Sequence, residues 1–541
     1  MKNIFKITLI ASLLTVLVGC ETGELDLLES PNNITVGSAD PNFVLNDIQL
    51  NFRNSANRYA VTSMALTRMI NQFGSYNNVV DNLELNGTTR PWFQSYQMFS
   101  NIDLLGEIDA NDPDGIPNHI GMAQVLEAYA YMLLVDFVGD VPYSQAVQPE
   151  EFPNPVADSG AEVYAAQIAL LDDAIANLSS GSLRTPEDQF YGDFNAENWI
   201  ALANSLKIRA YLNMRLVDPA GATAGINAAA SQNIIDTTEE DFQFQYGTTL
   251  DPESRHPYFT GNYLAAGAAT YMSNYLYDIM NVGDDQAPFV ETGNIDPRAR
   301  YYFYRQRSSA PSGSDLPCVN GGAIYDYCYV GNLYWGRDHT DDEGLPNDAT
   351  KRTTYGVYPA GGAFDRDLFE QARAVSESLD GEGIMPYYLA STTHFALAEA
   401  ALTLGTAGNP ATLLEQGMRL SMNKVRDFAA GLATDGLGMT DGDINAKVAE
   451  TLAEFNAGTT QQKLAVIARE WLIASYGNGT EPYNTYRRTG EPNLQSPIIA
   501  AGPFPRVWSY PSNEVINNPN INQQTLTTQV FWDNNPANFI D

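Results

Sequence analysis

The sequence predicts a mainly α-helical protein, in which a scaffold of packed helices carries a large, irregular, loop-rich insert. Three observations indicate this fold class. Apolar residues recur at helical spacing in the first part of the chain and again in the later part. The middle part is instead rich in Gly, Pro, Asn, Asp and Tyr. Hydrophobic residues make up 44% of the chain and charged residues 17%, which is typical of a large folded core.

The first part of the scaffold is expected over residues 43–222. Its helical segments are Asn46–Gln72, Ile120–Phe137, Gly160–Leu178 and Asn195–Val217, the last with Asn195 as its N-cap. Small residues such as Ala123 and Ala203 let helices approach closely, as in a TPR-like stack. No clean repeat of about 34 residues is present, so any repeats are degenerate.

The loop-rich insert is expected over residues 223–380, where Ala265–Met280 is the clearest helix. A long segment with little regular structure is uncommon in a compact domain unless it carries function. We therefore expect the insert and residues 481–541 to form a ligand face. The second part of the scaffold is expected over 381–480, with helices at Pro386–Leu404, Ala411–Leu432 and Thr459–Tyr476. Residues 43–541 would then form one domain.

The amino terminus has the pattern of a lipoprotein secretion signal. Two lysines precede an apolar stretch at residues 7–18, which is too short to span a bilayer. Leu17-Val18-Gly19-Cys20 then matches a lipobox, in which the cysteine sulfur becomes bonded to diacylglycerol. We expect residues 1–19 to be removed, Cys20 to hold the protein at a membrane surface, and residues 20–42 to be a flexible tether. No later segment is expected to be long and apolar enough to span.

The net charge restricts the classes of partner. Lys and Arg number 29 against 65 Asp and Glu, so the formal charge is −36. Such a field repels phosphate backbones, which excludes nucleic acid as a favoured partner. It also disfavours sulfated or uronic-acid polymers, because these would need a local basic patch. Arg487-Arg488 is only a pair.

Enzyme signatures are missing from the sequence. The four histidines do not pair at metal-ligand spacing, and HExxH, G-x-S-x-G, Walker and dinucleotide motifs do not occur. We therefore expect no catalytic constellation and no cofactor. A glycosidase-type carboxylate pair cannot be selected among 65 acids. The acidic loop with Asp338, Asp341 and Asp342 leaves calcium open as a weaker alternative to a solvated turn.

Two further cysteines, Cys318 and Cys328, lie ten positions apart in a Gly- and Tyr-rich stretch. In an exported protein this arrangement predicts a disulfide that closes the loop. A zinc pair is the weaker interpretation, because no second Cys or His pair lies nearby.

Aromatic side chains in loop-like segments are the candidate ligand contacts. They form three groups: Tyr325, Tyr327, Tyr329, Tyr334 and Trp335; Trp92 and Tyr96; and Tyr258 and Tyr263. Flat rings can stack on the apolar faces of sugars while neighbouring Asn, Asp and Arg bind hydroxyls. The same rings can instead pack the loops onto the body or hold peptide side chains, and for any single ring packing is the commoner role.

Several segments together resemble the SusD/RagB family of outer-membrane nutrient-binding lipoproteins, in particular its SusD-like branch. They follow in family order behind the lipobox: Val135–Tyr143 (VDFVGDVPY), Trp199–Arg209 (WIALANSLKIR), Asp296–Arg298 (DPR), Tyr334–His339 (YWGRDH), Tyr355–Gly362 (YGVYPAGG), Phe395–Ala400 (FALAEA), Tyr486–Gly490 (YRRTG) and Arg506–Pro511 (RVWSYP). Each segment is weak alone, and the match covers nearly the whole chain.

The resemblance implies a TPR-like scaffold and a non-catalytic, lipid-anchored protein at the outer-membrane surface. It implies a SusC-like TonB-dependent transporter as partner, to which a captured glycan is delivered, or a peptide in some members. Ligand contacts vary within the family, so no binding residue is carried over. Five residues of the shared segments are expected to hold helices and loops together: Asp136, Trp199, Arg209, Glu399 and Arg488. A surface glycan hydrolase and a purely structural lipoprotein are the alternatives from other classes.

Overall fold

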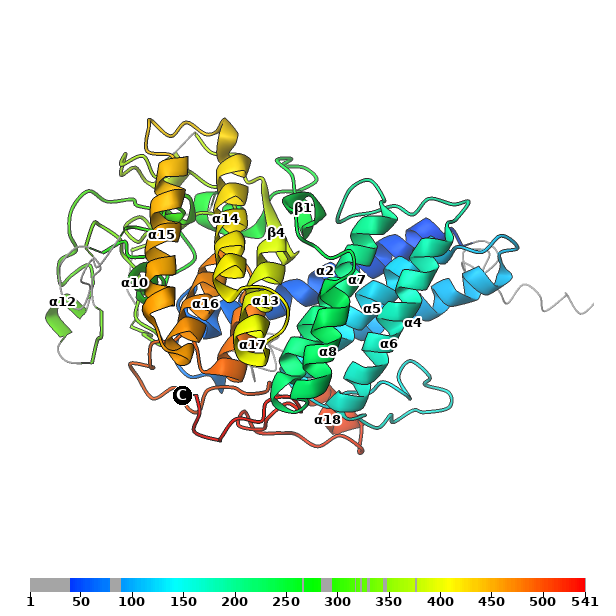
Figure 1. Ribbon diagram of the computed structural model, residues 1–541. Helices are drawn as coiled ribbons and strands as arrows, with labels where there is room; N and C mark the ends of the chain where they lie inside the picture. Colours follow the sequence, from blue (N-terminus) through cyan, green and yellow to red (C-terminus); the bar gives the residue numbers. More distant parts are fainter. Residues whose placement is uncertain are drawn as a thin grey trace, which may run out of the picture.

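The computed structural model describes residues 39–77, 89–264, 267–283, 294–316, 318–321, 324–327, 331–343, 348–374 and 377–540. The signal peptide, Cys20 and most of the tether lie outside these ranges. The described chain is mainly α-helical with a few short strands, as the sequence predicts. Figure 1 shows two groups of helices, one early and one late in the chain, with α2 running between them.

The early group consists of α2 (Pro41–Leu66), α4 (Thr89–Asn111), α5 (Pro117–Val138), α6 (Gly160–Ser180), α7 (Ala196–Asn213) and α8 (Pro219–Ala230). Neighbours in the chain are neighbours in space: α2 packs on α4, α5 on α6, α6 on α7 and α7 on α8 (Figure 1). The Asn195 side chain accepts a hydrogen bond from the Glu197 N–H, which confirms the predicted N-cap of α7. This sequential stacking is the TPR-like architecture.

One helix corrects an expectation about membrane segments. Among the described residues, α5 is long and apolar enough to cross a membrane by length and composition. However, 83% of its most apolar window is buried inside the fold, because α2, α4, α6 and α7 pack around it. A helix that is apolar on all sides is expected at the centre of a large core.

The late group consists of α13 (Ala390–Leu404), α14 (Pro410–Phe428), α15 (Asp441–Ala457), α16 (Thr460–Ala474) and α17 (Thr480–Thr489). Capping boxes begin α15 and α16, with Thr440 and Asp443 in one and Thr459 and Gln462 in the other. Helix α13 packs on α14 and α16 and also on α7, whereas α17 packs on α2. These contacts join the two groups into one core.

The insert leaves and rejoins the scaffold through a two-stranded antiparallel sheet, in which β1 (Phe242–Tyr246) pairs with β4 (Gly383–Tyr388). A second pair joins β2 (Phe303–Tyr304) to β3 (Thr354–Tyr355). The remaining elements are short: α9 (Pro257–Phe259), η5 (Thr260–Leu264), α10 (Asn274–Ile279), α11 (Ala299–Tyr302), α12 (Cys318–Gly321) and α18 (Ser512–Asn517), with 3-10 turns at Met214–Leu216, Thr238–Glu240, Ala372–Ala374 and Ala429–Gly431. The predicted large, irregular insert is therefore confirmed.

Several predicted boundaries are wrong. Of the described residues 267–280 in the expected helix Ala265–Met280, only Asn274–Ile279 is helical, because Met272 and Ser273 form β-bridges to Ile70 and Arg337. Pro386 lies in β4 rather than in the following helix. The pattern missed α4, α8, α15 and α17. Helices α4, α15 and α17 carry many polar residues, so their sequence signal is weak; a capping box begins α15, and tertiary packing buries every residue of α17.

Five residues of the shared segments that were expected to hold helices and loops together are buried and hydrogen-bonded: Asp136, Trp199, Arg209, Glu399 and Arg488. Arg488 holds Glu399 through two hydrogen bonds of 2.6 and 2.7 Å, with both side chains fully buried. Burial raises the pKa of Glu399, but the charges of Arg488 and Arg215 outweigh this effect and hold the pKa below its ordinary value. Trp199 donates to Asp188 at 2.7 Å. Such groups join helices that lie far apart in the chain.

Candidate functional site

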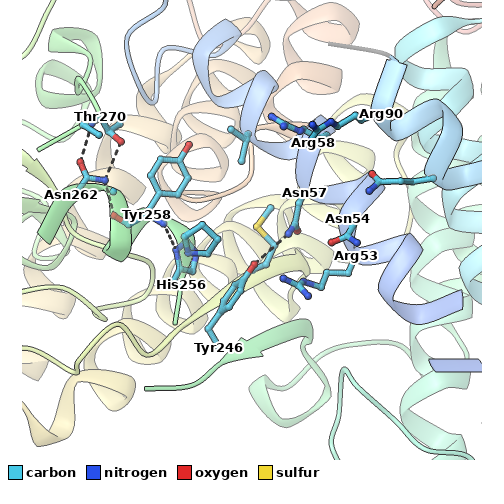
Figure 2. Close-up of a pocket in the computed structure, with 16 residues that line it drawn as sticks. Arg53, Asn54, Asn57, Arg58, Arg90, Tyr246, His256, Tyr258, Asn262 and Thr270 are labelled. Atoms are coloured by element: carbon cyan, nitrogen blue, oxygen red, sulfur yellow. Dashed lines mark hydrogen bonds between the residues drawn. The ribbon is translucent and has the colours of Figure 1, made fainter. Parts of the chain in front are cut away.

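A cavity of about 690 Å³ opens between the early scaffold and the beginning of the insert. Figure 2 shows its walls, with Arg53, Asn57 and Arg58 on one side and His256, Tyr258 and Asn262 on the other. Its volume suits a small-molecule or oligomeric ligand. The lining residues are Arg53, Asn54, Asn57, Arg58, Val61, Arg90, Gln94, Tyr246, His256, Pro257, Tyr258, Gly261, Asn262, Ala269, Thr270 and Met385.

The scaffold wall follows from helical periodicity. Arg53, Asn57 and Val61 follow one another at intervals of four residues on one face of α2, and Arg58 lines the cavity from the edge of that face. Fully buried residues such as Phe52 lie on the other side of α2 and hold it in the core. The first turns of α4 contribute further polar residues. The cavity therefore has a rigid, polar wall carried by two long helices.

The insert wall is fixed by local hydrogen bonds. Asn262 accepts from the Thr270 N–H at 2.9 Å and donates to the Thr270 hydroxyl at 3.1 Å and to the Tyr258 carbonyl at 2.7 Å. His256 caps α9, because its Nδ1 accepts from the Tyr258 N–H at 3.2 Å. Burial lowers the pKa of His256 to about 3, so the ring is neutral at neutral pH.

Tyr258 is the half-buried aromatic ring of the cavity. It stacks on Tyr355 with the ring centroids 4.4 Å apart and the planes 19° apart. Tyr355 stacks on Tyr476 at 4.7 Å, and Tyr476 stacks on Tyr302 at 4.2 Å. This column of rings continues from the cavity into the interior. It positions Tyr258 firmly beside the cavity, where its exposed part can contact an apolar face of a ligand.

The side chains that line the cavity carry positive charge, whereas the whole chain has a net charge of −36. Arg53, Arg58 and Arg90 line it, and no Asp or Glu is among the lining residues that the structure describes. Two polar atoms in the wall, Arg53 Nε and Gln94 Oε1, are buried without a hydrogen-bond partner. Unsatisfied buried polar atoms are costly, so these two favour a polar ligand beside them.

A second hollow of about 580 Å³ extends the site along the insert. It shares Arg53, Tyr246 and Pro257 with the first cavity. At its far side Arg255 is held by Glu253 through two hydrogen bonds of 2.7 and 2.6 Å. The two hollows together form an elongated site.

Of the aromatic residues that the sequence predicts as ligand contacts, only Tyr258 lines this cavity. Trp335, Tyr334, Trp92 and Tyr263 are buried, at 2 to 5% exposure. The Tyr263 hydroxyl donates to the Tyr355 carbonyl at 3.1 Å, and the Tyr334 ring packs against the Arg305 guanidinium. These four rings offer no exposed face, which corrects the expectation that they form stacking platforms, because packing of the insert covers them.

The remaining predicted rings are half-buried or lie outside the described residues. Tyr96 donates to the Pro142 carbonyl at 2.7 Å, and Tyr327 donates to Asp278 at 3.3 Å. Tyr325 is half-buried. Tyr329 lies outside the described residues, as does Cys328, whereas Cys318 is disulfide-bonded.

The acidic loop gives no support to the calcium alternative. Asp338 accepts from the Asn274 amide at 2.7 Å, and Asp341 pairs with Arg337 at 2.9 Å, whereas Asp342 is exposed. Within the described part of the chain, no group of three or more His, Cys, Asp or Glu side chains could hold a metal ion. Asp338 and Asp341 therefore serve as internal hydrogen-bond acceptors.

Near the cavity lies an aromatic pair that was not predicted, formed by the exposed ring of Phe73 and the half-buried ring of Tyr271. Phe73 is 43% exposed, and its ring meets Tyr271 edge-on with the centroids 5.2 Å apart. The Arg352 guanidinium lies 3.5 Å from the centroid of the Tyr271 ring, and Tyr271 is next in the chain to Thr270 of the cavity wall. No sequence pattern marks this pair, because the two rings come from distant segments.

Together the fold and the site define a TPR-like helical protein with an elongated ligand cavity between scaffold and insert. The chain belongs to the SusD-like family, whose model, SusD-like_2, is described as starch-binding and associating with the outer membrane and matches residues 31–306. This confirms the resemblance to the SusD/RagB family. No curated protein sequence matches the chain.

Solved structures share the fold. A SusD/RagB family protein from Bacteroides thetaiotaomicron is 19% identical, with a TM-score of 0.67, and the match covers 92% of this chain and 100% of that one. A SusD homologue from Bacteroides fragilis is 18% identical, with a TM-score of 0.65 and coverage of 92% and 99%. A chitin-binding SusD homologue from Flavobacterium johnsoniae is 18% identical, with a TM-score of 0.63 and coverage of 92% and 100%.

Proposed function

We propose that this protein is a lipid-anchored cell-surface protein that captures a glycan in the cavity between α2, α4 and the insert. It does not cleave the glycan but delivers it to a SusC-like TonB-dependent transporter. The observation that carries the proposal is the cavity itself, which combines the half-buried ring of Tyr258 with the amides of Asn54 and Asn57 and with arginines. Sugar binding needs this combination of an apolar ring face and hydroxyl-binding polar groups.

The absence of a carboxylate pair supports binding without hydrolysis. A glycoside hydrolase places two carboxylates about 5 to 9.5 Å apart on either side of the scissile bond. Among the described residues that line the cavity there is neither Asp nor Glu. The nearest carboxylate of the adjoining hollow, Glu253, is occupied by Arg255.

The family supports a carbohydrate over a peptide as ligand. Its description is starch-binding, and one protein of the same fold, from Flavobacterium johnsoniae, is described as chitin-binding. The lipobox at Cys20 and the family's association with the outer membrane support anchoring at that membrane. Delivery to a transporter is what this class of anchored binding protein implies.

The binding proposal is tested by isothermal titration calorimetry with the full chain in detergent, against starch, chitin and other oligosaccharides and against peptides. We expect one glycan class to bind and to be recovered uncleaved. Binding of peptides alone, or release of shorter sugars, would contradict the proposal.

Anchoring and delivery need their own test in cells. We expect the wild-type protein to fractionate with outer membranes and to co-purify with a TonB-dependent transporter. A Cys20→Ala variant should lose the membrane association. Equal membrane association of the variant would exclude Cys20 as the anchor, and co-purification with no outer-membrane transporter would exclude delivery.

A further inference from the structure

We propose that the glycan captured in this cavity is acidic, with carboxylate or sulfate groups that bind Arg53, Arg58 and Arg90. This inference rests on the proposed function and specifies the chemical class of its ligand. It reverses the expectation drawn from the net charge, which disfavours acidic polymers unless a local basic patch exists. The structure forms that patch from residues that are separated in the sequence.

The first argument is that, among the described residues, these three arginines form no ion pair, although the chain has a large excess of acids. Carboxylates outnumber basic residues 65 to 29, so an arginine has many potential partners. Most arginines have one: Arg209, Arg298 and Arg488, for example, are buried in ion pairs. In the described ranges, by contrast, no ion pair involves any of the three cavity arginines. Three such cations, collected in one cavity, create a local positive field.

The second argument is that the guanidinium N–H donors of the three arginines lie on the same side of the cavity. Arg53 and Arg58 line it from α2, and Arg90 lies in the first turn of α4, on the same side of the cavity in Figure 2. Arg53 packs over the Phe244 ring at 4.3 Å, while its buried Nε has no partner. A guanidinium binds carboxylate or sulfate with paired N–H donors, so a donor already free of solvent and of protein acceptors fits an anionic group.

The third argument favours a sugar over an acidic peptide. Tyr258 presents a half-buried ring opposite the arginine wall, and Gln94 Oε1 is a buried acceptor without a donor. A sugar ring that carries an acidic group can place its apolar face on Tyr258, a hydroxyl donor on Gln94 and its anion on the arginines. A carboxylate side chain of a peptide uses only the last of these contacts.

The experiment measures binding of the full chain to matched acidic and neutral glycans. The first pair is polygalacturonate and its methyl ester, and the second is κ-carrageenan and its desulfated form. Starch, chitin oligosaccharides and poly-glutamate complete the panel. The test variant is Arg58→Gln/Arg90→Gln, which removes two charges from the cavity. Its control is Arg307→Gln/Arg373→Gln, which removes two charges from exposed arginines outside the lining.

We expect an acidic glycan to bind, and its neutral partner to bind at least about tenfold more weakly. The cavity variant should lose about tenfold or more in affinity and the control variant little, and added salt should weaken only the acidic ligand. Tighter binding of polygalacturonate than of its methyl ester would identify the recognised group as a carboxylate. Tighter binding of κ-carrageenan than of its desulfated form would identify it as a sulfate.

Three results would overturn the inference. Tight binding of a neutral glycan, unaffected by the cavity variant, would refute the acidic class but leave glycan capture standing. Binding of poly-glutamate alone would refute both. Binding to no member of the panel would also count against both.

Discussion

Replacing Asp136 by asparagine tests whether one buried carboxylate holds the two helical groups and the carboxy-terminal segment together. Asp136 is fully buried near the end of α5. Its Oδ2 accepts from Arg209 at 2.6 Å and from Asn484 at 2.9 Å. Its Oδ1 accepts from the indole N–H of Trp532 at 2.9 Å and from the Tyr164 hydroxyl. These four donors come from α6, α7, α17 and the final loop.

The size of the loss in the free energy of unfolding depends on which hydrogen bonds the variant keeps. In Asp136→Asn, the remaining oxygen keeps two donors when it takes the Oδ1 position, while the new NH₂ group faces Arg209 and Asn484. Two hydrogen bonds to the charged carboxylate, from Arg209 and Asn484, are lost, each worth about 1.5 to 3 kcal/mol. Arg209 retains Glu481 at 2.5 Å, which places the cost near the lower end of the 3 to 5 kcal/mol typical of a broken buried pair. We expect the free energy of unfolding to fall by about 3 kcal/mol.

The assay is denaturant-induced unfolding of the wild type and the variant, followed by tryptophan fluorescence. Asp173→Asn is the matched control, because Asp173 is exposed on α6 and forms no hydrogen bond or ion pair in the described structure. We expect the control to change stability by less than about 0.5 kcal/mol. An Asp136→Asn variant as stable as this control would refute the reasoning.

Three further predictions concern stability, pH and binding. Arg488→Met should cost about 3 to 5 kcal/mol and the double variant Glu399→Leu/Arg488→Met much less, as measured by denaturant unfolding, and equal losses would contradict a coupled pair. Because burial lowers the pKa of His256 to about 3, the unfolded state binds up to one more proton than the folded state between about pH 6.5 and pH 3, and the following slope applies in this window. Stability should therefore fall with decreasing pH by about 1.4 kcal/mol per pH unit more in the wild type than in His256→Asn, and parallel pH profiles would refute this. Tyr258→Ala should weaken glycan binding about tenfold in calorimetry, whereas Phe43→Ala, at an exposed ring outside the cavity, should not, and equal effects would exclude a stacking role.

The helices that were predicted correctly are those with a strong local signal. The apolar run that became α5 ends at Gly139, as the Gly and Pro after it predict, and Asn195 caps α7. The sequence also predicted that Glu399 and Arg488 need partners if they are buried, and the structure pairs them with each other. In each case the prediction depended on the residues next to the one in question in the sequence.

The candidate site was predicted only in part, because its residues come together from distant segments. Tyr258 was named as a ligand contact, and it lines the cavity. Trp335 was also named, but it is 2% exposed, and nothing in its neighbouring residues distinguishes a packed ring from an exposed one. The spacing of Arg53 and Asn57 was the available signal, since it places two polar residues on one helical face.

The sequence by itself determined the mainly helical fold class, the irregular insert and the family, because periodicity, turn residues and ordered motifs are local properties of the chain. Only the tertiary structure decided which rings are buried and which arginines form ion pairs. Burial and ion pairing depend on contacts between segments such as α2 and the insert, which are about 200 residues apart in the chain. The net charge of −36 therefore describes the molecule as a whole, while the charge of the cavity depends on the fold.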